Sequence, residues 1–170
     1  MKNLDKYLSL LGEKADGLLL TSRYSRYYGA EFDIAEGVAV VSAKGCRYFT
    51  DSRYIESAQN NIHDFQVIMT DRANPFTKLI NEAIADFGIT TLGFEENYLT
   101  VAEWNLYQDK LNAKLVPMHK EISSFRQTKE SWELDNMRKA QEITDKAFAE
   151  VCTRIRIGMT EKELQAELIY

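Results

Sequence analysis

The chain has 170 residues, a formal net charge of −5 and 45% apolar side chains. This composition supports a packed core and argues against a disordered or low-complexity chain. The acidic balance argues against a basic nucleic-acid-binding face, so we expect no nucleic acid among the partners of the protein.

Two further features bear on the compartment in which the protein works. No N-terminal stretch combines a basic start with an apolar run, so we expect neither a signal peptide nor a membrane partner. The two cysteines, Cys46 and Cys152, lie far apart and are typical of free thiols in a reducing compartment. We therefore expect a cytoplasmic protein.

The first part of the chain alternates apolar runs with segments of helical spacing. From the N-terminus, the sequence predicts a helix over 4–11, a strand over 17–22, a helical turn over 25–29, a β-hairpin of strands 37–42 and 47–51, a helix over 55–60 and a strand over 65–69. It then predicts a helix over 76–87, a strand over 91–95, a helix over 101–111 and a strand over 114–118.

Local capping signals mark the starts of two of these helices. Asn74 is expected to cap the helix over 76–87, with Pro75 in its first turn, and Thr100 and Glu103 form a capping box for the next helix. The alternation predicts an α/β fold with a mixed sheet of about six strands and flanking helices. We place the end of this first domain at residue 128.

Residues 129–170 predict one long amphipathic helix and a second, shorter helix. The long helix carries an apolar stripe at intervals of three or four residues, made of Leu134, Met137, Ala140, Ile143, Ala147, Phe148, Val151 and Ile155. Gly158 is expected to end it, and Thr160 with Glu163 forms a capping box for the second helix. That helix reaches Tyr170 without a stop signal, so we expect the chain to be part of a longer protein.

The residues by themselves supply no complete catalytic set. His63 and His119 have no second histidine at metal-ligand spacing, and no glycine-rich phosphate loop is present. The adjacent Glu95 and Glu96 follow a strand, so their side chains point to opposite faces, and we expect solvated charges or helix caps rather than a shared proton.

Two polar-aromatic clusters follow predicted strands, at positions where binding sites often lie. They are TSRYSRYYGAEFD, residues 21–33, and FTDSRY, residues 49–54. Arginine and tyrosine offer charge, hydrogen-bond donors and flat contact area at low entropic cost. The alternative is structural: Asp51 caps the following helix and pairs with Arg53, and the tyrosines are half-buried core residues.

Four stretches occur in a fixed order along nearly the whole chain. They are residues 28–40, the run FTDSRYIESA over 49–58, the helix positions Lys129, Glu133, Leu134, Met137, Arg138, Lys139 and Ala140, and the run GMTEKEL over 158–164. Together they resemble the front part of the aminopeptidase P, prolidase and creatinase family of proline-specific metallopeptidases, whose catalytic domain has the pita-bread fold. Ser25 and Glu31 depart from the family pattern, which leaves the role of the loop between Tyr24 and Phe32 open.

The resemblance implies a ribonuclease-H-like first domain over 1–128 and, over 129–170, a linker helix and the beginning of a catalytic domain. In this family, two divalent metal ions, usually manganese or cobalt, hold a hydroxide that attacks the peptide bond before a proline. Their ligands, two aspartates, a histidine and two glutamates, are expected after residue 170. We therefore expect no catalytic residue and no metal ligand in this chain, and no activity from it alone.

The resemblance also implies partners and a role for the first domain. The substrate is a short peptide with proline at its second position, and the first domain supports a homo-dimer or higher homo-oligomer and limits access to the active site. The residues expected at the entrance are Arg53, Tyr54 and Tyr28, with Asp51 orienting Arg53. Two alternatives remain open, a creatinase-type amidinohydrolase on the same scaffold and a free-standing dimerisation or interaction module.

Overall fold

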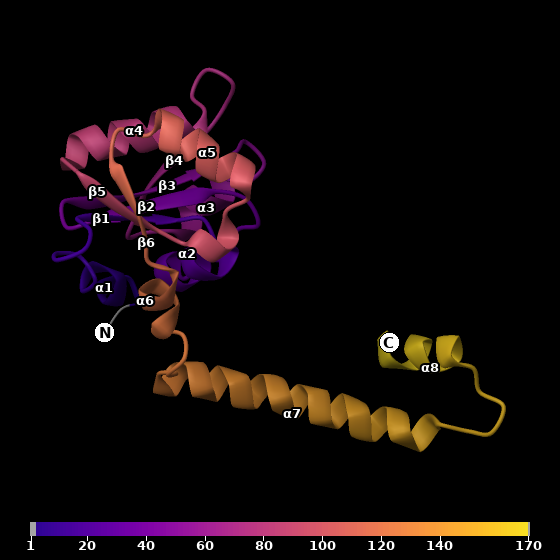
Figure 1. Ribbon diagram of the computed structural model, residues 1–170. Helices are drawn as coiled ribbons and strands as arrows, with labels where there is room; N and C mark the ends of the chain where they lie inside the picture. The colour runs from indigo at the N-terminus through magenta and orange to yellow at the C-terminus, as the bar shows by residue number, and fades with distance from the viewer. Residues whose placement is uncertain (1–2, 170) are drawn as a thin grey trace. The chain divides into compact units, whose positions relative to one another are not determined.

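The computed structural model describes residues 3–169 of the chain, as alternating strands and helices (Figure 1). The strands are β1 (Gly17–Leu20), β2 (Val38–Ser42), β3 (Gly45–Thr50), β4 (Gln66–Met69), β5 (Thr91–Phe94) and β6 (Lys114–Pro117). The helices are α1 (Asn3–Leu8), α2 (Arg23–Ala30), α3 (Ile55–Asn61), α4 (Phe76–Phe87), the 3-10 helix η1 (Glu96–Tyr98), α5 (Val101–Lys110), α6 (His119–Ser124), α7 (Ser131–Arg154) and α8 (Glu161–Ile169).

The strands form one mixed six-stranded sheet in the order β4-β3-β2-β1-β5-β6, which confirms the predicted fold class. The β2–β3 hairpin pairs Val38 with Phe49 and Ser42 with Gly45. Among the described strands, β2 alone runs against the others, since β1 is parallel to β5, β3 to β4 and β5 to β6. The carboxyl ends of these other strands therefore meet at one edge of the sheet.

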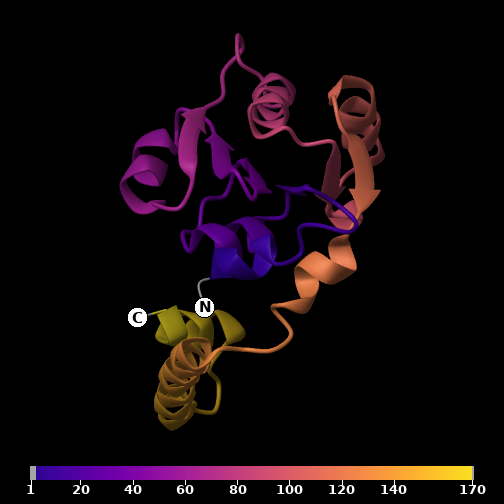
Figure 2. The same cartoon turned by 90° about the vertical axis from the view of Figure 1, so that its left-hand side faces the viewer.

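Helices cover both faces of this sheet and bury a separate apolar cluster on each side. One cluster joins the sheet to α1, α2, α3 and α6, and the other joins it to α4 and α5. Figures 1 and 2 show α4 and α5 on one side of the sheet and α1, α2 and α6 on the other. Strand residues such as Leu18 and Leu19 point to opposite clusters, so the central strand is apolar on both faces.

Several predicted bounds in the first part of the chain were wrong. The first helix ends at Leu8 instead of continuing to residue 11, and the expected helical turn is a full helix, α2, capped by the Ser22 side chain. Two elements were missed, η1 and α6. The α5 helix begins as predicted, with the reciprocal capping box of Thr100 and Glu103 in place.

The expected cap of α4 was also wrong. Pro75 occupies the cap position and supplies no side-chain hydrogen bond, while Asn74 lies outside the helix. The Asn74 backbone N–H donates to Asp71 Oδ1 at 2.7 Å, and its side chain accepts from Lys78. The proline favours extended backbone at the residue before it, which holds Asn74 in the turn.

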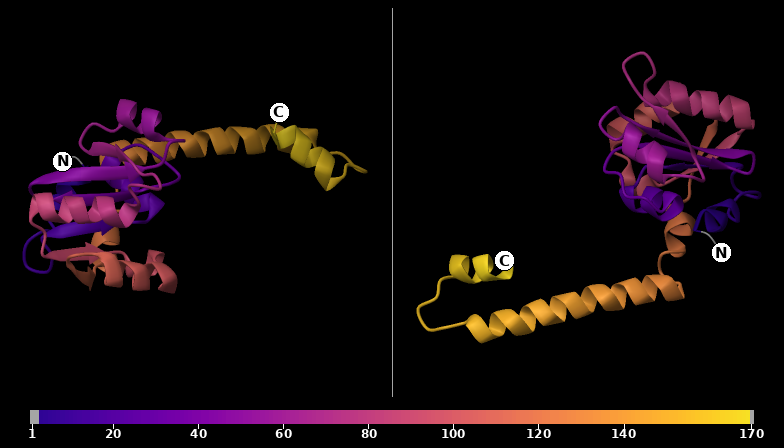
Figure 3. Two further views of the ribbon diagram at one scale, coloured as in Figure 1. Left: turned by 90° about the horizontal axis from the view of Figure 1, so that it is seen from above. Right: turned by 180° about the vertical axis from the view of Figure 1, so that it is seen from behind.

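Residues 126–170 form a second unit, separate from residues 1–125. The α7 helix ends at Arg154, before the predicted Gly158, and α8 runs back beside the last turns of α7 (Figure 3). Arg154 bonds both Glu150 and Glu167 and so links the two helices, and the capping box of Thr160 and Glu163 is present as predicted.

The predicted apolar stripe of α7 is present, and most of it is exposed to solvent in the described part of the chain. Met137 is 54% exposed, Ile143 69% and Phe148 67%, and Val151 is the one buried residue among the described residues of this helix. An apolar stripe on an amphipathic helix is typical of a face that packs against another element.

The adjacent carboxylates at the end of β5 have different surroundings. Glu95 is 0% exposed, so of the two expected roles, a solvated charge or a helix cap, the solvated charge is wrong for this residue. Its Oε2 accepts from the backbone N–H groups of Thr21 (3.1 Å) and Ser22 (3.0 Å), and its Oε1 accepts from Ser25 Oγ (2.6 Å). Glu96 is exposed and accepts from the backbone N–H of His119 (2.8 Å), so each carboxylate caps the start of a different helix.

These two carboxylates make a matched pair for a stability measurement. Replacing Glu95 with alanine leaves buried donors of Thr21, Ser22 and Ser25 without an acceptor, so we expect E95A to lower the free energy of unfolding by about 3 kcal/mol. The control E96A removes one exposed cap and should cost about 1 kcal/mol. Urea unfolding followed by circular dichroism measures both. Equal losses for the two variants would contradict the anchoring role of Glu95.

Candidate functional site

The two polar-aromatic clusters singled out in the sequence lie at the same edge of the sheet. The first follows β1 and the second follows β3, and these strands run in the same direction because both are antiparallel to β2. The buried Glu95 follows β5 at this edge and ties the start of α2 to the sheet. We call this the carboxyl edge, and it is the candidate functional site.

Arg53 is presented at the carboxyl edge by two neighbours. Its guanidinium bonds both oxygens of Asp51, with Nη2 to Oδ2 at 2.6 Å, and lies 5.1 Å from the centre of the Tyr54 ring. The hydrogen bond from Arg53 holds the pKa of the Asp51 carboxyl below its ordinary value. The Arg53 side chain is 64% exposed, so this restrained cation faces solvent.

The structural alternative for residues 49–54 was that Asp51 pairs with Arg53 and caps the following helix. The pairing is present, and the cap is not. Asp51 pairs with Arg53 and also accepts from the Arg53 backbone N–H (2.9 Å). It does not cap α3, because the cap residue is Tyr54 and makes no side-chain cap bond. The Asp51 side chain therefore stabilises the turn that carries Arg53, while its backbone carbonyl accepts from the N–H of Ile55, the first residue of α3 (3.1 Å).

A second arginine–carboxylate pair lies in the first cluster. Arg23 bonds Asp33 through both Nε (2.8 Å) and Nη2 (2.5 Å). This hydrogen bond lowers the pKa of the Asp33 carboxyl, and it raises the pKa of Arg23, to which the nearby Tyr24 and Tyr54 add a smaller electrostatic effect.

A buried arginine fixes the loop that supplies Asp33. Arg26 is 4% exposed and donates to the carbonyl oxygen of Ala35 and to the Tyr48 hydroxyl, each at 3.0 Å. Gly37, at φ +146°, closes this loop so tightly that a Cβ would lie 2.5 Å from the carbonyl oxygen of Phe49. Sequence reasoning missed Arg26, since nothing local distinguishes it from the exposed Arg23.

Tyr28 lies in the interior, whereas Arg53 is exposed and Tyr54 is half-buried. It is 6% exposed and belongs to the apolar cluster under α1 and α2. Its hydroxyl accepts from Lys6 Nζ at 2.9 Å and donates to the carbonyl oxygen of Phe125 at 3.4 Å. These contacts give Tyr28 a packing role between the N-terminal helices and α6.

A line of rings extends the carboxyl edge towards β6. Tyr24 and Tyr98 have ring centres 6.4 Å apart, and Tyr98 is 5.5 Å from His119. Both tyrosines are exposed, at 60% and 42%. His119 is half-buried, and His63 is exposed.

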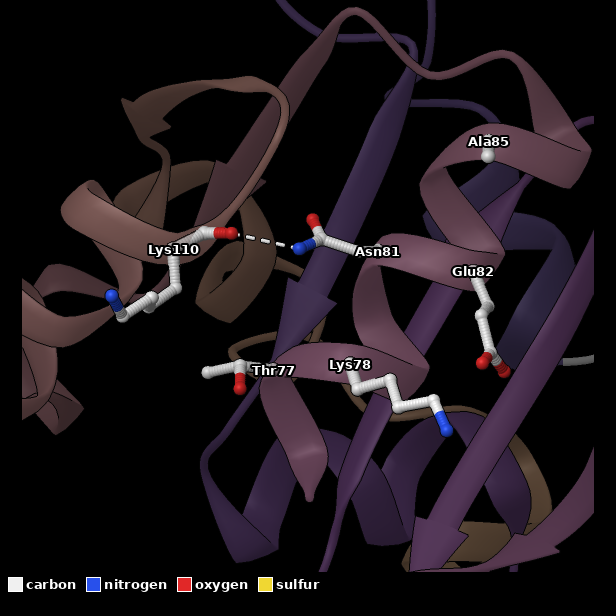
Figure 4. A pocket seen from close by; sticks show the side chains of 6 residues that line it. All are labelled: Thr77, Lys78, Asn81, Glu82, Ala85 and Lys110. Atoms are coloured by element: carbon white, nitrogen blue, oxygen red, sulfur yellow. Dashed lines mark hydrogen bonds between the residues drawn. The ribbon is translucent and has the colours of Figure 1, made fainter. Parts of the chain in front are cut away.

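A hollow lies between α4 and α5 (Figure 4). It is lined by Thr77, Lys78, Asn81, Glu82, Ala85 and Lys110. Asn81 Nδ2 donates to the carbonyl oxygen of Lys110 at 2.7 Å, and Asn81 Oδ1 accepts from the Asn112 backbone N–H at 2.8 Å. Asn81 thus fastens the end of α5 to α4, and its side chain is occupied by that structural task.

Within residues 3–169, no group of three histidine, cysteine, aspartate or glutamate side chains converges in a way that could hold a metal ion. Over the same range, no helix is long and apolar enough to cross a membrane.

Comparison with known proteins identifies the family. Residues 2–128 match the creatinase/prolidase N-terminal domain, and residues 135–170 match metallopeptidase family M24. A Bacillus subtilis protein described as the uncharacterized peptidase YqhT is 30% identical over 167 residues, which cover 97% of this chain and 47% of that protein.

Solved structures show the same relationship. The Xaa-Pro dipeptidase from Bacillus anthracis superimposes with a TM-score of 0.88 at 29% identity, covering 99% of this chain and 47% of that one. The X-Pro aminopeptidase from Thermotoga maritima gives a TM-score of 0.88 at 27% identity, covering 99% of this chain and 48% of the other. The chain thus spans about half the length of these relatives. It belongs to the creatinase/prolidase N-terminal domain family, and its C-terminal residues match metallopeptidase family M24.

Proposed function

We propose that this chain is the N-terminal, non-catalytic part of a metal-dependent Xaa-Pro peptidase. The observation that carries the proposal is the succession of the two family matches, over 2–128 and 135–170, in a chain that covers about half of its Xaa-Pro peptidase relatives. On this account residues 1–128 are the first domain, and residues 129–170 are the linker helix and the beginning of the catalytic domain.

The proposed reaction is hydrolysis of the peptide bond before a proline at the second position of a short peptide. Two divalent metal ions, manganese or cobalt, would supply the attacking hydroxide from a site in the rest of the catalytic domain. In this proposal, residues 3–169 form subunit contacts and restrict the access of substrate, and they do not take part in bond cleavage. The match to metallopeptidase family M24 supports this division.

The carboxyl edge is the surface we assign to substrate access. Arg53 is exposed, its guanidinium donates three hydrogen bonds to the Asp51 carboxylate and lies 5.1 Å from the centre of the Tyr54 ring, so it offers a fixed cation to a peptide substrate. A restrained guanidinium loses less conformational entropy on binding than a free one. Tyr28 is buried, and we assign it no contact with substrate.

We also propose a homo-dimer or higher homo-oligomer in the cytoplasm. Tyr24 and Tyr27 are 60% and 51% exposed on α2, and exposed tyrosine is enriched in protein interfaces. Both cysteines are free, Cys46 partly exposed and Cys152 exposed, as is usual in a reducing compartment.

If the metal site lies in the rest of the catalytic domain, residues 1–170 alone should be inactive. The purified chain should release no product from Xaa-Pro dipeptides or from creatine with manganese or cobalt added, and the intact protein should cleave the dipeptides. A coupled proline assay and mass spectrometry measure both. Turnover by the purified chain would show that metal ligands lie within it.

The access role predicts a kinetic defect for a single surface change. In the intact protein, R53A removes a charged hydrogen-bond donor and should lower kcat/KM for Xaa-Pro substrates by about tenfold, as expected for loss of one such contact. The control K44A changes an exposed cation in the β2–β3 turn, at the other end of the sheet, and should leave kcat/KM unchanged. Wild-type kinetics together with wild-type oligomerisation in R53A would remove the basis for the access role.

A further inference from the structure

An apolar cleft opens in the first unit beside the carboxyl edge. It has a volume of about 520 Å³ and lies between the ends of β5 and β6, η1 and the first turns of α5. Its lining is Phe94, Glu96, Leu99, Thr100, Val101, Trp104 and Pro117. The family comparisons and the proposed reaction assign no role to this cleft.

The walls of the cleft are rigid and aromatic. Trp104 stacks on Phe94, with ring centres 4.9 Å apart and an interplanar angle of 23°. Val101, on the rim, is 77% exposed, although it is the first residue of a helix whose start is fixed by a capping box. An ordered aromatic wall beside an exposed aliphatic side chain suits a ligand that buries flat apolar groups.

The backbone at this edge disfavours recognition by strand addition. β6 is the outer strand, and its Pro117 has no N–H to donate. Strand addition needs the outward N–H groups of the edge strand, and Pro117 removes one of these donors. Side-chain contacts are the alternative, and polyproline-type segments make such contacts in aromatic grooves.

The charge of the cleft lining indicates which charge a bound peptide should carry. Glu96 is the charged residue of the lining, and it is exposed. One of its oxygens, Oε2, accepts from the His119 backbone N–H, which fixes the carboxylate at the cleft. A fixed carboxylate at the side of an apolar groove is complementary to a basic side chain and repels an acidic one.

We propose that this cleft binds an extended, proline-rich peptide segment that carries a basic residue next to its prolines. The proline rings pack on Trp104 and Val101, and the basic side chain pairs with Glu96. This binding is separate from bond cleavage and does not rest on the proposed peptidase reaction.

Trp104 provides a direct probe of the occupied cleft. The other tryptophan of these 170 residues, Trp132, lies in α7 and is 47% exposed, so W132F in the purified 170-residue chain leaves Trp104 as its single tryptophan. In this background, the peptide acetyl-Pro-Pro-Pro-Arg-Pro-Pro-Pro-amide should change the Trp104 emission in a saturable way. The same peptide with glutamate in place of arginine, and one with alanine in place of every proline, should bind at least about tenfold more weakly, because each lacks one of the two contacts.

Substitutions on the rim test the contacts without disturbing the core. E96Q keeps an acceptor for His119 but loses the charge, and should weaken binding about threefold, as for an exposed ion pair. V101S should weaken it about fivefold, through loss of apolar contact, while L106S, elsewhere on the exposed surface of α5, should have no effect. Unaltered Trp104 emission at millimolar peptide, equal binding of the three peptides, or equal affinities for V101S and L106S would each overturn the proposal.

Discussion

The buried carboxylate of Glu95 is the interaction on which the carboxyl edge depends. A charge with no exposed surface is stable only when its oxygens are bonded, and here the donors are Thr21, Ser22 and Ser25 at the start of α2. The helix dipole adds to this stabilisation, because its positive end faces the carboxylate. The bond set joins β5 to the β1–α2 connection and so fixes where α2 begins.

The direction of α2 then decides which side chains reach the surface. Arg23 and Tyr24 of its first turn are exposed, whereas Ser25, Arg26 and Tyr28 face the interior. Arg23 holds Asp33, and Arg26 holds the backbone of the same loop from beneath. The surface proposed to guide substrate is therefore built by polar groups inside the domain as well as by those that face solvent.

The sequence predicts those features of the structure that depend on interactions between residues close together in the chain. The strands, the β2–β3 hairpin and the two capping boxes depend on residues a few positions apart, and they were predicted correctly. The burial of Glu95 depends on donors more than 70 residues earlier in the chain, so strand alternation gave its direction but not its partners. Asn74 was predicted as a cap from its type alone, and Asp71 holds it elsewhere.

The candidate site was predictable in part for the same reason. The position of residues 49–54 after a strand, and the pairing of Asp51 with Arg53, follow from the local sequence. The meeting of the two clusters at one edge requires the strand order, and the burial of Tyr28 requires the packing of α1 and α6 around it. The amphipathic pattern of α7 was evident from the sequence, but the exposure of Met137, Ile143 and Phe148 was not.

We propose that a non-catalytic α/β domain presents Arg53 to a metal centre formed by other residues of a longer protein. A crystal structure of the intact protein with manganese and an uncleaved Xaa-Pro peptide analogue tests it most directly. The account predicts both metal ions on side chains outside residues 3–169 and the Arg53–Tyr54 turn lining the path to the bound peptide. Metal ions held by side chains within residues 3–169, or a bound peptide remote from Arg53, would contradict it.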